Sequence, residues 1–257
     1  MSAIARPLLI VGDRFFGFSG QEGVLTVSQF IDELGLGVYS LDDRPIVIQA
    51  GQGVTSAERQ SIHDHARLFG LAERLDFRYH EPALAARNEA HKHDSCNTLI
   101  ADLQRLDVDL FAANLRVHND NELLIDHQTG EHVQGMVAIE AARQMFLAVS
   151  ERYHASRYSE RNYYYVIESM NTAFENFLFP LDATIEFRTV KAELDDPSRL
   201  SFAAEISILQ AGRRSSLTEV AYTAFESHVI EAKEHKRARF AVDQIVAAVP
   251  VQELIAA

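Results

Sequence analysis

One stretch of this sequence, residues 135–149, limits the possible folds more than any other part of the chain. It is predicted to be a helix, and most of its residues are apolar, with interruptions at Glu140, Arg143 and Gln144. A helix that is apolar on nearly all sides must be covered on nearly all sides. An antiparallel sheet that curves around the helix would provide this cover, and a partner subunit or a domain formed by the first part of the chain would complete it.

The strands that such a sheet needs are found on both sides of the helix. Strands are predicted at residues 98–101 and 110–117 before it, and at 163–169, 183–190, 200–209 and 217–225 after it. Apolar and polar residues alternate in the later strands, which indicates one buried and one polar face and is typical of antiparallel sheets. The expected fold class is therefore α+β, with one antiparallel sheet around a long apolar helix.

The first 80 residues follow a different pattern, in which strands and helices alternate. Short apolar runs predict buried strands at residues 7–11, 45–50 and 75–79. The two helices between them each begin with a capping box, formed by Thr26 and Gln29 in the first and by Thr55 and Glu58 in the second. This order of elements indicates a small parallel sheet.

The sequence thus predicts three regions. Residues 1–85 form a small α/β domain, residues 90–230 form the sheet with its long helix, and residues 230–257 form a C-terminal helix that Pro250 interrupts. The segment 81–94 is alanine-rich and then histidine-rich, and we interpret it as a connection between the first two regions.

The overall charge and the apolar pattern exclude several classes of partner. With a net charge of −13, the chain does not attract nucleic acid by bulk electrostatics. No apolar run approaches the roughly 20 residues that a membrane helix needs, and the N-terminus lacks the layout of a signal peptide. The single cysteine, Cys96, allows no intrachain disulfide and fits a reducing compartment. We therefore expect a cytoplasmic protein that binds neither nucleic acid nor membrane.

Neither a cofactor nor a metal is expected. The turn at residues 51–53, Gly-Gln-Gly, follows a strand and precedes a helix, but Ser56 stands where a dinucleotide-binding loop has its third glycine. A plain strand-turn-helix is therefore favoured there. His63 and His65 lie on different faces of their helix, which is poor spacing for a metal site.

A polar loop with two histidines, His127 and His132, leads directly into the long helix. Glu140, Arg143 and Gln144 are spaced i, i+3 and i+4, so they share one helix face. The loop can fold back over the first helical turns and bring an imidazole towards Glu140. Because a buried carboxylate is costly unless it is paired, this position indicates one of two things. It is either a reactive site or an ion pair between Glu140 and Arg143, with Gln144 bonded to a strand carbonyl.

These residues resemble the signature of the AfsA-type hotdog domain family, which makes precursors of butyrolactone-type signalling molecules in bacteria. The resemblance is carried by His127, by 132–136 (His-Val-Gln-Gly-Met) and by 139–144 (Ile-Glu-Ala-Ala-Arg-Gln). Segments 91–93 (His-Lys-His) and 97–100 (Asn-Thr-Leu-Ile) resemble the start of the family's domain. The chain departs from the pattern at Gln134, where the family usually has proline, and its histidine loop is one residue longer. It has one hotdog domain where the family usually has two.

The resemblance implies a fold, a substrate class and partners. It implies a homodimer of hotdog domains acting on a β-ketoacyl thioester of an acyl carrier protein or coenzyme A. The acyl group would be joined to the hydroxyl of dihydroxyacetone phosphate, in the biosynthesis of a signalling molecule or secondary metabolite. Two alternatives stay open: a hydroxyacyl-thioester dehydratase or thioesterase, and a non-catalytic hotdog that binds acyl chains or acts as a scaffold. The basic cluster at residues 233–239 is interpreted as a solvated helix face, with docking of an acidic carrier protein as the alternative.

The residue types suggest roles for the individual positions. His127, Glu140 and His132 are the candidate catalytic residues, because thioester chemistry needs an acid or base near neutral pH. For His132, a role at the start of the helix, bonded to the backbone, is the favoured alternative. The candidate substrate-binding residues are Gly135, Met136, Arg143 and Gln144. Gly135 would let an acyl chain pass close to the backbone, and Arg143 would hold Glu140 or a substrate phosphate.

Overall fold

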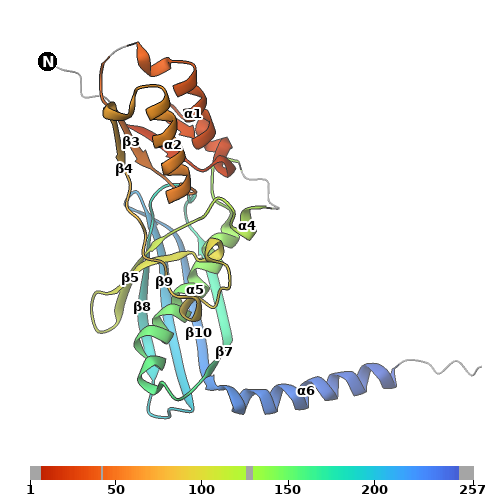
Figure 1. Cartoon of the computed structure of the whole chain (residues 1–257). Coiled ribbons are helices and arrows are strands. Elements are labelled where there is room, and N and C mark those ends of the chain that lie inside the picture. The colour runs from red at the N-terminus through yellow and green to blue at the C-terminus, as the bar shows by residue number, and fades with distance from the viewer. Residues whose placement is uncertain (1–6, 42, 126–129, 249–257) are drawn as a thin grey trace, which may run out of the picture.

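The computed structural model describes residues 7–41, 43–125 and 130–248, and it contains two sheets and a projecting helix (Figure 1). A small parallel sheet lies at one end, an antiparallel sheet with a long helix lies in the middle, and the C-terminal helix points away from both.

The first sheet is parallel and has the order β2-β1-β3-β4. Its strands are β1 (Leu8–Val11), β2 (Val24–Thr26), β3 (Ile46–Ala50) and β4 (Leu75–Arg78). Strand β2 was not predicted, because it is only three residues long and runs directly into a helix. The helices α1 (Val27–Gly35) and α2 (Ser56–Leu68) both begin with the predicted capping boxes. The short 3-10 helices here are η1 (Asp13–Gly20), η2 (Val38–Ser40) and η3 (Ala72–Arg74).

The second sheet is antiparallel throughout and has the order β5-β6-β8-β9-β10-β7. Its strands are β5 (Ile100–Arg105), β6 (Leu110–Leu115), β7 (Tyr163–Phe174), β8 (Thr184–Glu193), β9 (Arg199–Gln210) and β10 (Arg213–Glu226). All six had been predicted, with β7 and β10 several residues longer than expected. Strand β7 closes one side of the sheet as an edge strand.

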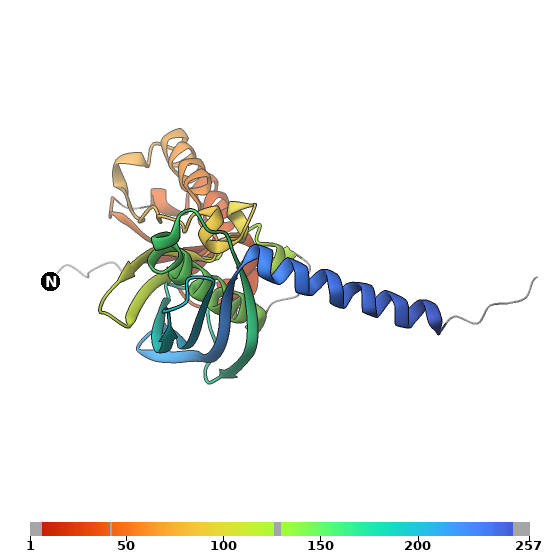
Figure 2. The ribbon, with the colours of Figure 1, turned by 90° about the horizontal axis from the view of Figure 1, so that it is seen from below.

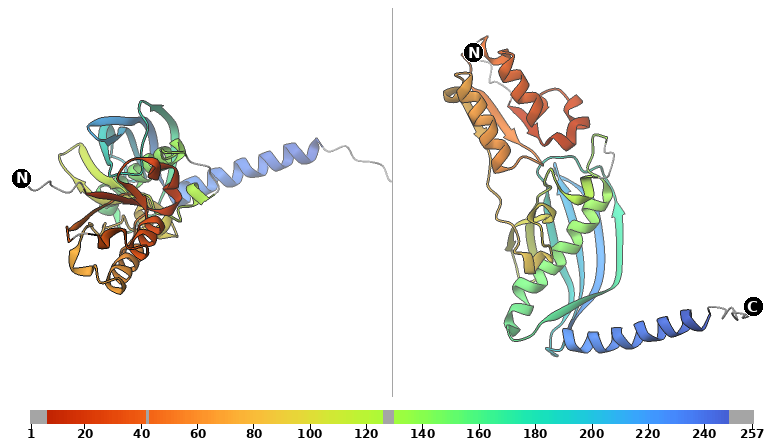
Figure 3. Two further views of the ribbon diagram at one scale, coloured as in Figure 1. Left: turned by 90° about the horizontal axis from the view of Figure 1, so that it is seen from above. Right: turned by 45° about the vertical axis from the view of Figure 1, so that its right-hand side comes forward.

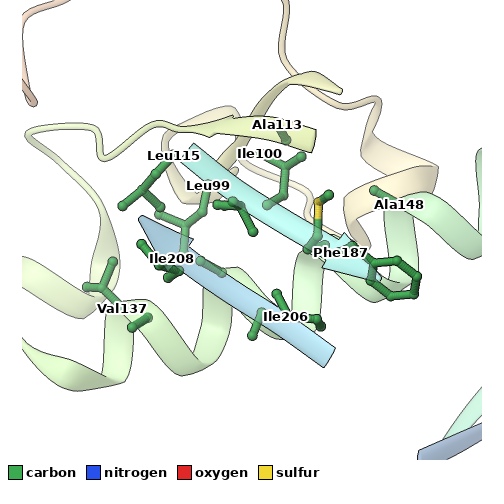
Figure 4. Close-up of a cluster of buried hydrophobic side chains, with 14 of the residues drawn as sticks. Leu99, Ile100, Ala113, Leu115, Val137, Ala148, Phe187, Ile206 and Ile208 are labelled. Carbon is green, nitrogen blue, oxygen red and sulfur yellow. The ribbon is translucent and has the colours of Figure 1, made fainter. Parts of the chain in front are cut away.

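Helix α5 (Gly135–Tyr153) lies along the concave side of this sheet, as the right-hand view of Figure 3 shows. It runs for 19 residues because nothing after Gly135 breaks it: the sequence to Tyr153 contains neither glycine nor proline. Apolar side chains from the helix and the strands fill the space between them (Figure 4). Those labelled there include Leu115, Val137, Ala148, Phe187, Ile206 and Ile208. The prediction of an apolar helix covered by an antiparallel sheet is confirmed.

The other side of α5 is covered by the segment that we had interpreted as a connection between domains. This segment contains the short helices α3 (Arg87–Ala90) and η4 (Ser95–Asn97). The guanidinium of Arg152 in α5 donates to both carboxylate oxygens of Glu89 in α3, at 2.7 and 2.6 Å. The segment therefore also packs against α5. The sequence did not indicate this, because long-range contacts of this kind leave no periodic signal.

The two sheets are joined by the turn that follows β3. The side chain of Gln52 is buried; its Nε2 donates to the carbonyl oxygens of Leu115 and Leu181, and its Oε1 accepts from the N–H of Val117. A Cβ on Gly51 would lie 2.7 Å from the carbonyl oxygen of Pro180, so only glycine permits this approach. The glycine turn thus docks one domain onto the other.

The C-terminal helix α6 (Ser227–Ala247) projects from the end of the antiparallel sheet (Figure 2). It contains no buried residue, and it leaves the sheet beside the start of β7. Among the described residues, none of the helices has the length and apolar character needed to cross a lipid bilayer. The two remaining short helices are α4 (Glu122–Ile125) and η5 (Ala155–Tyr158).

Candidate functional site

The family-like residues gather where α5 begins. The N–H of Val133 donates to the carbonyl oxygen of Leu178 at 2.7 Å, which fixes the chain just before the helix. The side-chain amide of Gln134, the residue that replaces the family's proline, donates to the carbonyl oxygen of Leu123. His127 falls in residues 126–129, outside the described residues, so its predicted role stays a prediction.

Glu140 lies at the centre of a cluster of charged side chains on α5. Its carboxylate accepts from Arg143 Nε at 2.8 Å and Nη2 at 2.9 Å, and from Gln144 Nε2 at 3.0 Å. Lys92, from the segment that covers α5, places its Nζ 2.7 Å from the same carboxylate. We call Lys92, Glu140 and Arg143 the α5 charge cluster; sequence reasoning missed Lys92 because it lies far from Glu140 along the chain.

The electrostatics of this cluster keep Glu140 ionised. Burial opposes ionisation, but hydrogen bonds from Arg143, Lys92 and Gln144 outweigh it and lower the pKa of Glu140 to about 2. A carboxyl group with this pKa donates no proton near neutral pH and is a weak base. The observed geometry is the ion pair that the sequence left open as the alternative to a reactive site, with a second cation added.

The side chain of Gln144 forms hydrogen bonds with the backbone of the segment that leads into β5. Its Oε1 accepts from the N–H of Leu99 at 2.8 Å and its Nε2 donates to the carbonyl oxygen of Asn97 at 2.9 Å, and the side chain is fully buried. These bonds use both ends of the amide. Gln144 therefore holds the start of β5 against α5, and nothing of it is left to contact a substrate as predicted.

Gly135 and Met136, at the first turn of α5, lie in an aromatic environment. A Cβ on Gly135 would lie 2.9 Å from Cε1 of Phe174, so the ring occupies the space that we had expected an acyl chain to use. Met136, Phe174 and Phe177 are 55%, 57% and 69% exposed. We call these three exposed apolar residues, which all lie near the start of α5, the α5 entrance patch. The exposed ring of His132 packs against Phe177, with 4.9 Å between the ring centroids.

The small α/β domain contributes to the same end of α5, a function that the sequence did not suggest. The ring of Phe18 in η1 stacks on Phe179 with 5.6 Å between centroids, and Gln21 Nε2 donates to Glu131 Oε2 at 3.0 Å. A Cβ on Gly17 would lie only 2.4 Å from the carbonyl oxygen of Gly130. The segment from η1 to β2 therefore braces the chain immediately before α5. Only the glycine at position 17 could have signalled so close an approach in the sequence.

Two cavities lie near the junction of the domains, and the α5 charge cluster lines neither of them. One is bordered by Phe18, Val24, Glu131 and Phe179, next to the chain that leads into α5. The other lies between the parallel sheet and the antiparallel sheet. An open apolar channel to Glu140, which would favour an enzyme over a scaffold, is therefore not provided by either cavity.

Comparison with known proteins identifies the family. The model of the AfsA family, the A-factor biosynthesis hotdog domain, matches residues 76–226. A mutant thioesterase from Pseudomonas aeruginosa aligns at 16% sequence identity with a TM-score of 0.37, over 49% of this chain and 81% of that chain. A thioesterase from Haemophilus influenzae aligns at 12% identity with a TM-score of 0.38, over 56% of this chain and 91% of that chain. No curated protein sequence matches this chain. Because the family match spans more than half of the sequence and coincides with the sheet and helix described above, the chain belongs to the AfsA family of hotdog domains.

Proposed function

We propose that this chain is an acyltransferase that joins a β-ketoacyl group to the hydroxyl of a small phosphorylated acceptor. Membership of the AfsA family supports a hotdog protein that handles acyl thioesters. The donor in this proposal is a thioester of an acyl carrier protein or coenzyme A. The acceptor is a phosphorylated triose such as dihydroxyacetone phosphate, as the family resemblance implies.

The observation that carries the proposal is the excess positive charge of the α5 charge cluster. Lys92 and Arg143 share the single carboxylate of Glu140, so the cluster has a net charge of +1. Their side chains are 25% and 31% exposed, so both remain partly accessible to a ligand. Lysine and arginine are the side chains that bind phosphate best, and a phosphate of the acceptor would complete the charge balance.

The same cluster disfavours the alternative of dehydration. A dehydratase would use the helix carboxyl as a proton donor or acceptor, but the low pKa of Glu140 suits neither task. In our proposal Glu140 is a positioning residue that holds Lys92 and Arg143 in place. The histidines His127 and His132 are then the candidates for proton transfer.

The proposed reaction needs one proton shuttle and one set of donors. The acceptor's hydroxyl oxygen forms a bond to the thioester carbonyl carbon, the carbon–sulfur bond breaks, and the hydroxyl proton passes by way of a histidine to the departing thiolate. The first N–H groups of α5 have no partner within the helix, so they are suited to stabilise the carbonyl oxygen as it gains negative charge. The α5 entrance patch would receive the acyl chain.

The proposal includes a homodimer formed through strand β7. This strand is an edge of the sheet, and edge strands offer unpaired backbone groups to a neighbouring chain. Tyr164 and Ile167 of this strand are exposed. Phe174 of the α5 entrance patch lies at the end of β7, so a second copy docked there would border the candidate site.

Mass spectrometry of the products tests the proposal. The full chain is incubated with a β-ketoacyl thioester, with and without dihydroxyacetone phosphate. We expect the acyl ester of the triose phosphate, formed only when the acceptor is present, and much less of it with His132→Ala or Arg143→Gln than with the distant control Arg157→Gln. Release of free β-keto acid without acceptor would show a thioesterase instead, and the absence of any turnover would show a binding or scaffold protein.

A further inference from the structure

A second cavity, of about 600 Å³, lies between the two domains. One wall is formed by the segments that follow β3 and β4, which include Gly53, Thr55 and His80. The other wall is the end of the antiparallel sheet, including Asn114, Arg116 and Thr184. In open α/β sheets, ligands bind in the crevice outside the carboxyl ends of the parallel strands, and this cavity has that position. Its volume falls within the range of small-molecule sites, roughly 300–1,000 Å³.

The register of the strands shows that this cavity is separate from the α5 site. Asn114 pairs with Thr184, and both line the cavity, whereas Ile185, the next residue along β8, does not line it and is buried in the core around α5. Successive side chains of a strand point to opposite faces of a sheet. The cavity therefore lies on the face opposite to α5 and the α5 charge cluster. A ligand bound here is not the acceptor in the proposed acyl transfer.

Arg116 brings to this cavity a positive charge that has no direct ion pair among the described residues. One guanidinium nitrogen, Nη1, donates to the carbonyl oxygen of Ser95 at 2.8 Å. No carboxylate among the described residues forms an ion pair with it, and burial lowers the pKa of the guanidinium more than the nearby carboxylates of Glu81 and Glu58 raise it. A half-buried cation without a counter-ion is costly, so an anionic ligand would be bound favourably. The remaining N–H groups of Arg116 are available to it.

His118 adds a donor beside Arg116. Its Nδ1 accepts a hydrogen bond from the N–H of Asp120 at 3.0 Å, so the proton of the neutral ring lies on Nε2. Burial, and then the positive charge of Arg116, lowers the pKa of His118, which keeps the ring neutral near pH 7. The cavity thus offers a guanidinium and an imidazole N–H from neighbouring positions.

Some of the acidic residues that line the cavity already accept hydrogen bonds from other residues of the chain. Asp102 accepts from the N–H of Ala83 at 3.0 Å, from Asn114 Nδ2 at 3.0 Å and from His80 Nε2 at 3.2 Å. Glu81 accepts from Ser56 Oγ at 2.6 Å. Asp182 and Glu186 also line the cavity, and carboxylates in such a position are suited to accept hydrogen bonds from hydroxyl groups.

We propose that the cavity between the domains binds a phosphate monoester that carries hydroxyl groups, such as a sugar phosphate or a nucleoside monophosphate. Arg116 and His118 bind the phosphate, and Asp182 and Glu186 accept from the hydroxyl groups. Both domains line the site, so the bound ligand stabilises their docked arrangement. The site makes the α/β domain a ligand-sensing part of the protein, whatever reaction the hotdog domain performs.

Isothermal titration calorimetry of the full chain tests this site. The probes are AMP, ribose 5-phosphate and inorganic phosphate, with adenosine as the probe that lacks phosphate. We expect binding of the three phosphates and no binding of adenosine. Tighter binding of AMP than of ribose 5-phosphate would identify a nucleotide site, and the reverse would identify a sugar-phosphate site.

Variants show whether Arg116 and His118 are responsible. Arg116→Gln and His118→Gln should weaken phosphate binding at least about tenfold, whereas the control Arg239→Gln, with the same charge change on the distant helix α6, should stay within about twofold. If Arg116→Gln does not fold, Arg116→Lys and His118→Gln provide the measurement. Binding of adenosine as tight as that of AMP, no binding of any phosphate, or equal binding by the Arg116 variant and the control would overturn the proposal. Loss of acyl-transfer activity has no bearing on this result, because the site lies on the opposite face of the sheet.

Discussion

Glu140 and Arg116 are two partly buried charges on opposite sides of the same antiparallel sheet, and they differ in the number of charged partners that surround them. Glu140 has two cations and an amide within hydrogen-bond distance, so its charge is more than compensated inside the chain. Arg116 has a single backbone carbonyl and no ion pair among the described residues. The comparison indicates that Glu140, which is ion-paired, holds Lys92 and Arg143 in place. Arg116 has no ion pair among the described residues, so it is available to bind a ligand.

The contacts of Gln52 hold the two domains together around the Arg116 cavity. Their removal should cause the largest loss of stability among the variants considered. Gln52→Leu would take this partner from the carbonyl oxygen of Leu115 and the N–H of Val117, whereas the carbonyl oxygen of Leu181 still accepts from Gln210 Nε2 at 3.2 Å. Unpaired buried polar groups cost about 1–3 kcal/mol each, so we expect a total loss of about 3–4 kcal/mol in the free energy of unfolding. Urea denaturation measures it. A loss below about 1 kcal/mol would mean that Gln52 does not hold the domains together.

Removal of the compensated charge should have the next largest effect. Glu140→Ala leaves Lys92 and Arg143 close together without their carboxylate. We expect a loss of about 2–3 kcal/mol, near the low end for breaking a buried pair because these side chains keep some exposure. The matched control is Glu160→Ala, which removes an exposed partner of Arg161 and should change stability by less than about 0.5 kcal/mol. Equal effects of the two variants would contradict the distinction.

The pH dependence of stability sharpens the same comparison. The pKa of Glu140 in the folded chain, about 2, lies below its ordinary value of 4.5, so the ionised group stabilises the fold above about pH 4.5. This contribution is lost as the pH falls towards 2. The stability advantage of the wild type over Glu140→Gln should therefore shrink by about 2 kcal/mol between pH 4.5 and pH 2. An advantage that stays constant over this range would place the pKa elsewhere.

Replacement of the uncompensated charge should have the smallest effect on stability. Arg116→Gln removes one hydrogen bond to Ser95 but also a half-buried cation without a counter-ion. These effects oppose each other, so the free energy of unfolding should change by less than about 1 kcal/mol. Thermal or urea unfolding without added phosphate measures it. A loss of 2 kcal/mol or more would show that Arg116 holds the structure together and is not reserved for a ligand.

The elements of the fold could be predicted because their signals are local. The capping boxes at Thr26 and Thr55 fixed the starts of two helices, and alternation of apolar and polar residues located the strands of the antiparallel sheet. Strand β2 escaped because three residues are too few to show a pattern. The ends of β7 and β10 were underestimated, since pairing between strands extends them beyond the alternating core.

The candidate sites could be predicted only in part, because they depend on contacts between distant residues. The spacing of Glu140, Arg143 and Gln144 indicated one helix face, and the structure brings these three together. Nothing in the sequence showed that Lys92 would join them, or that Gln144 would be used by the backbone of Asn97 and Leu99. The cavity at Arg116 could not be predicted from the sequence either, since its walls come from two domains that lie far apart along the chain.

The central claim is that Lys92 and Arg143 hold the phosphate of an acyl acceptor, and steady-state kinetics with two acceptors tests it most directly. The rate of acyl transfer is measured against the concentration of dihydroxyacetone phosphate and of dihydroxyacetone, for the wild type, Lys92→Gln, Arg143→Gln and the control Arg157→Gln. We predict that Lys92→Gln and Arg143→Gln raise the KM for dihydroxyacetone phosphate about tenfold and leave transfer to dihydroxyacetone nearly unchanged, as expected for the loss of one charged contact. Equal changes for both acceptors, or none for either, would contradict the claim.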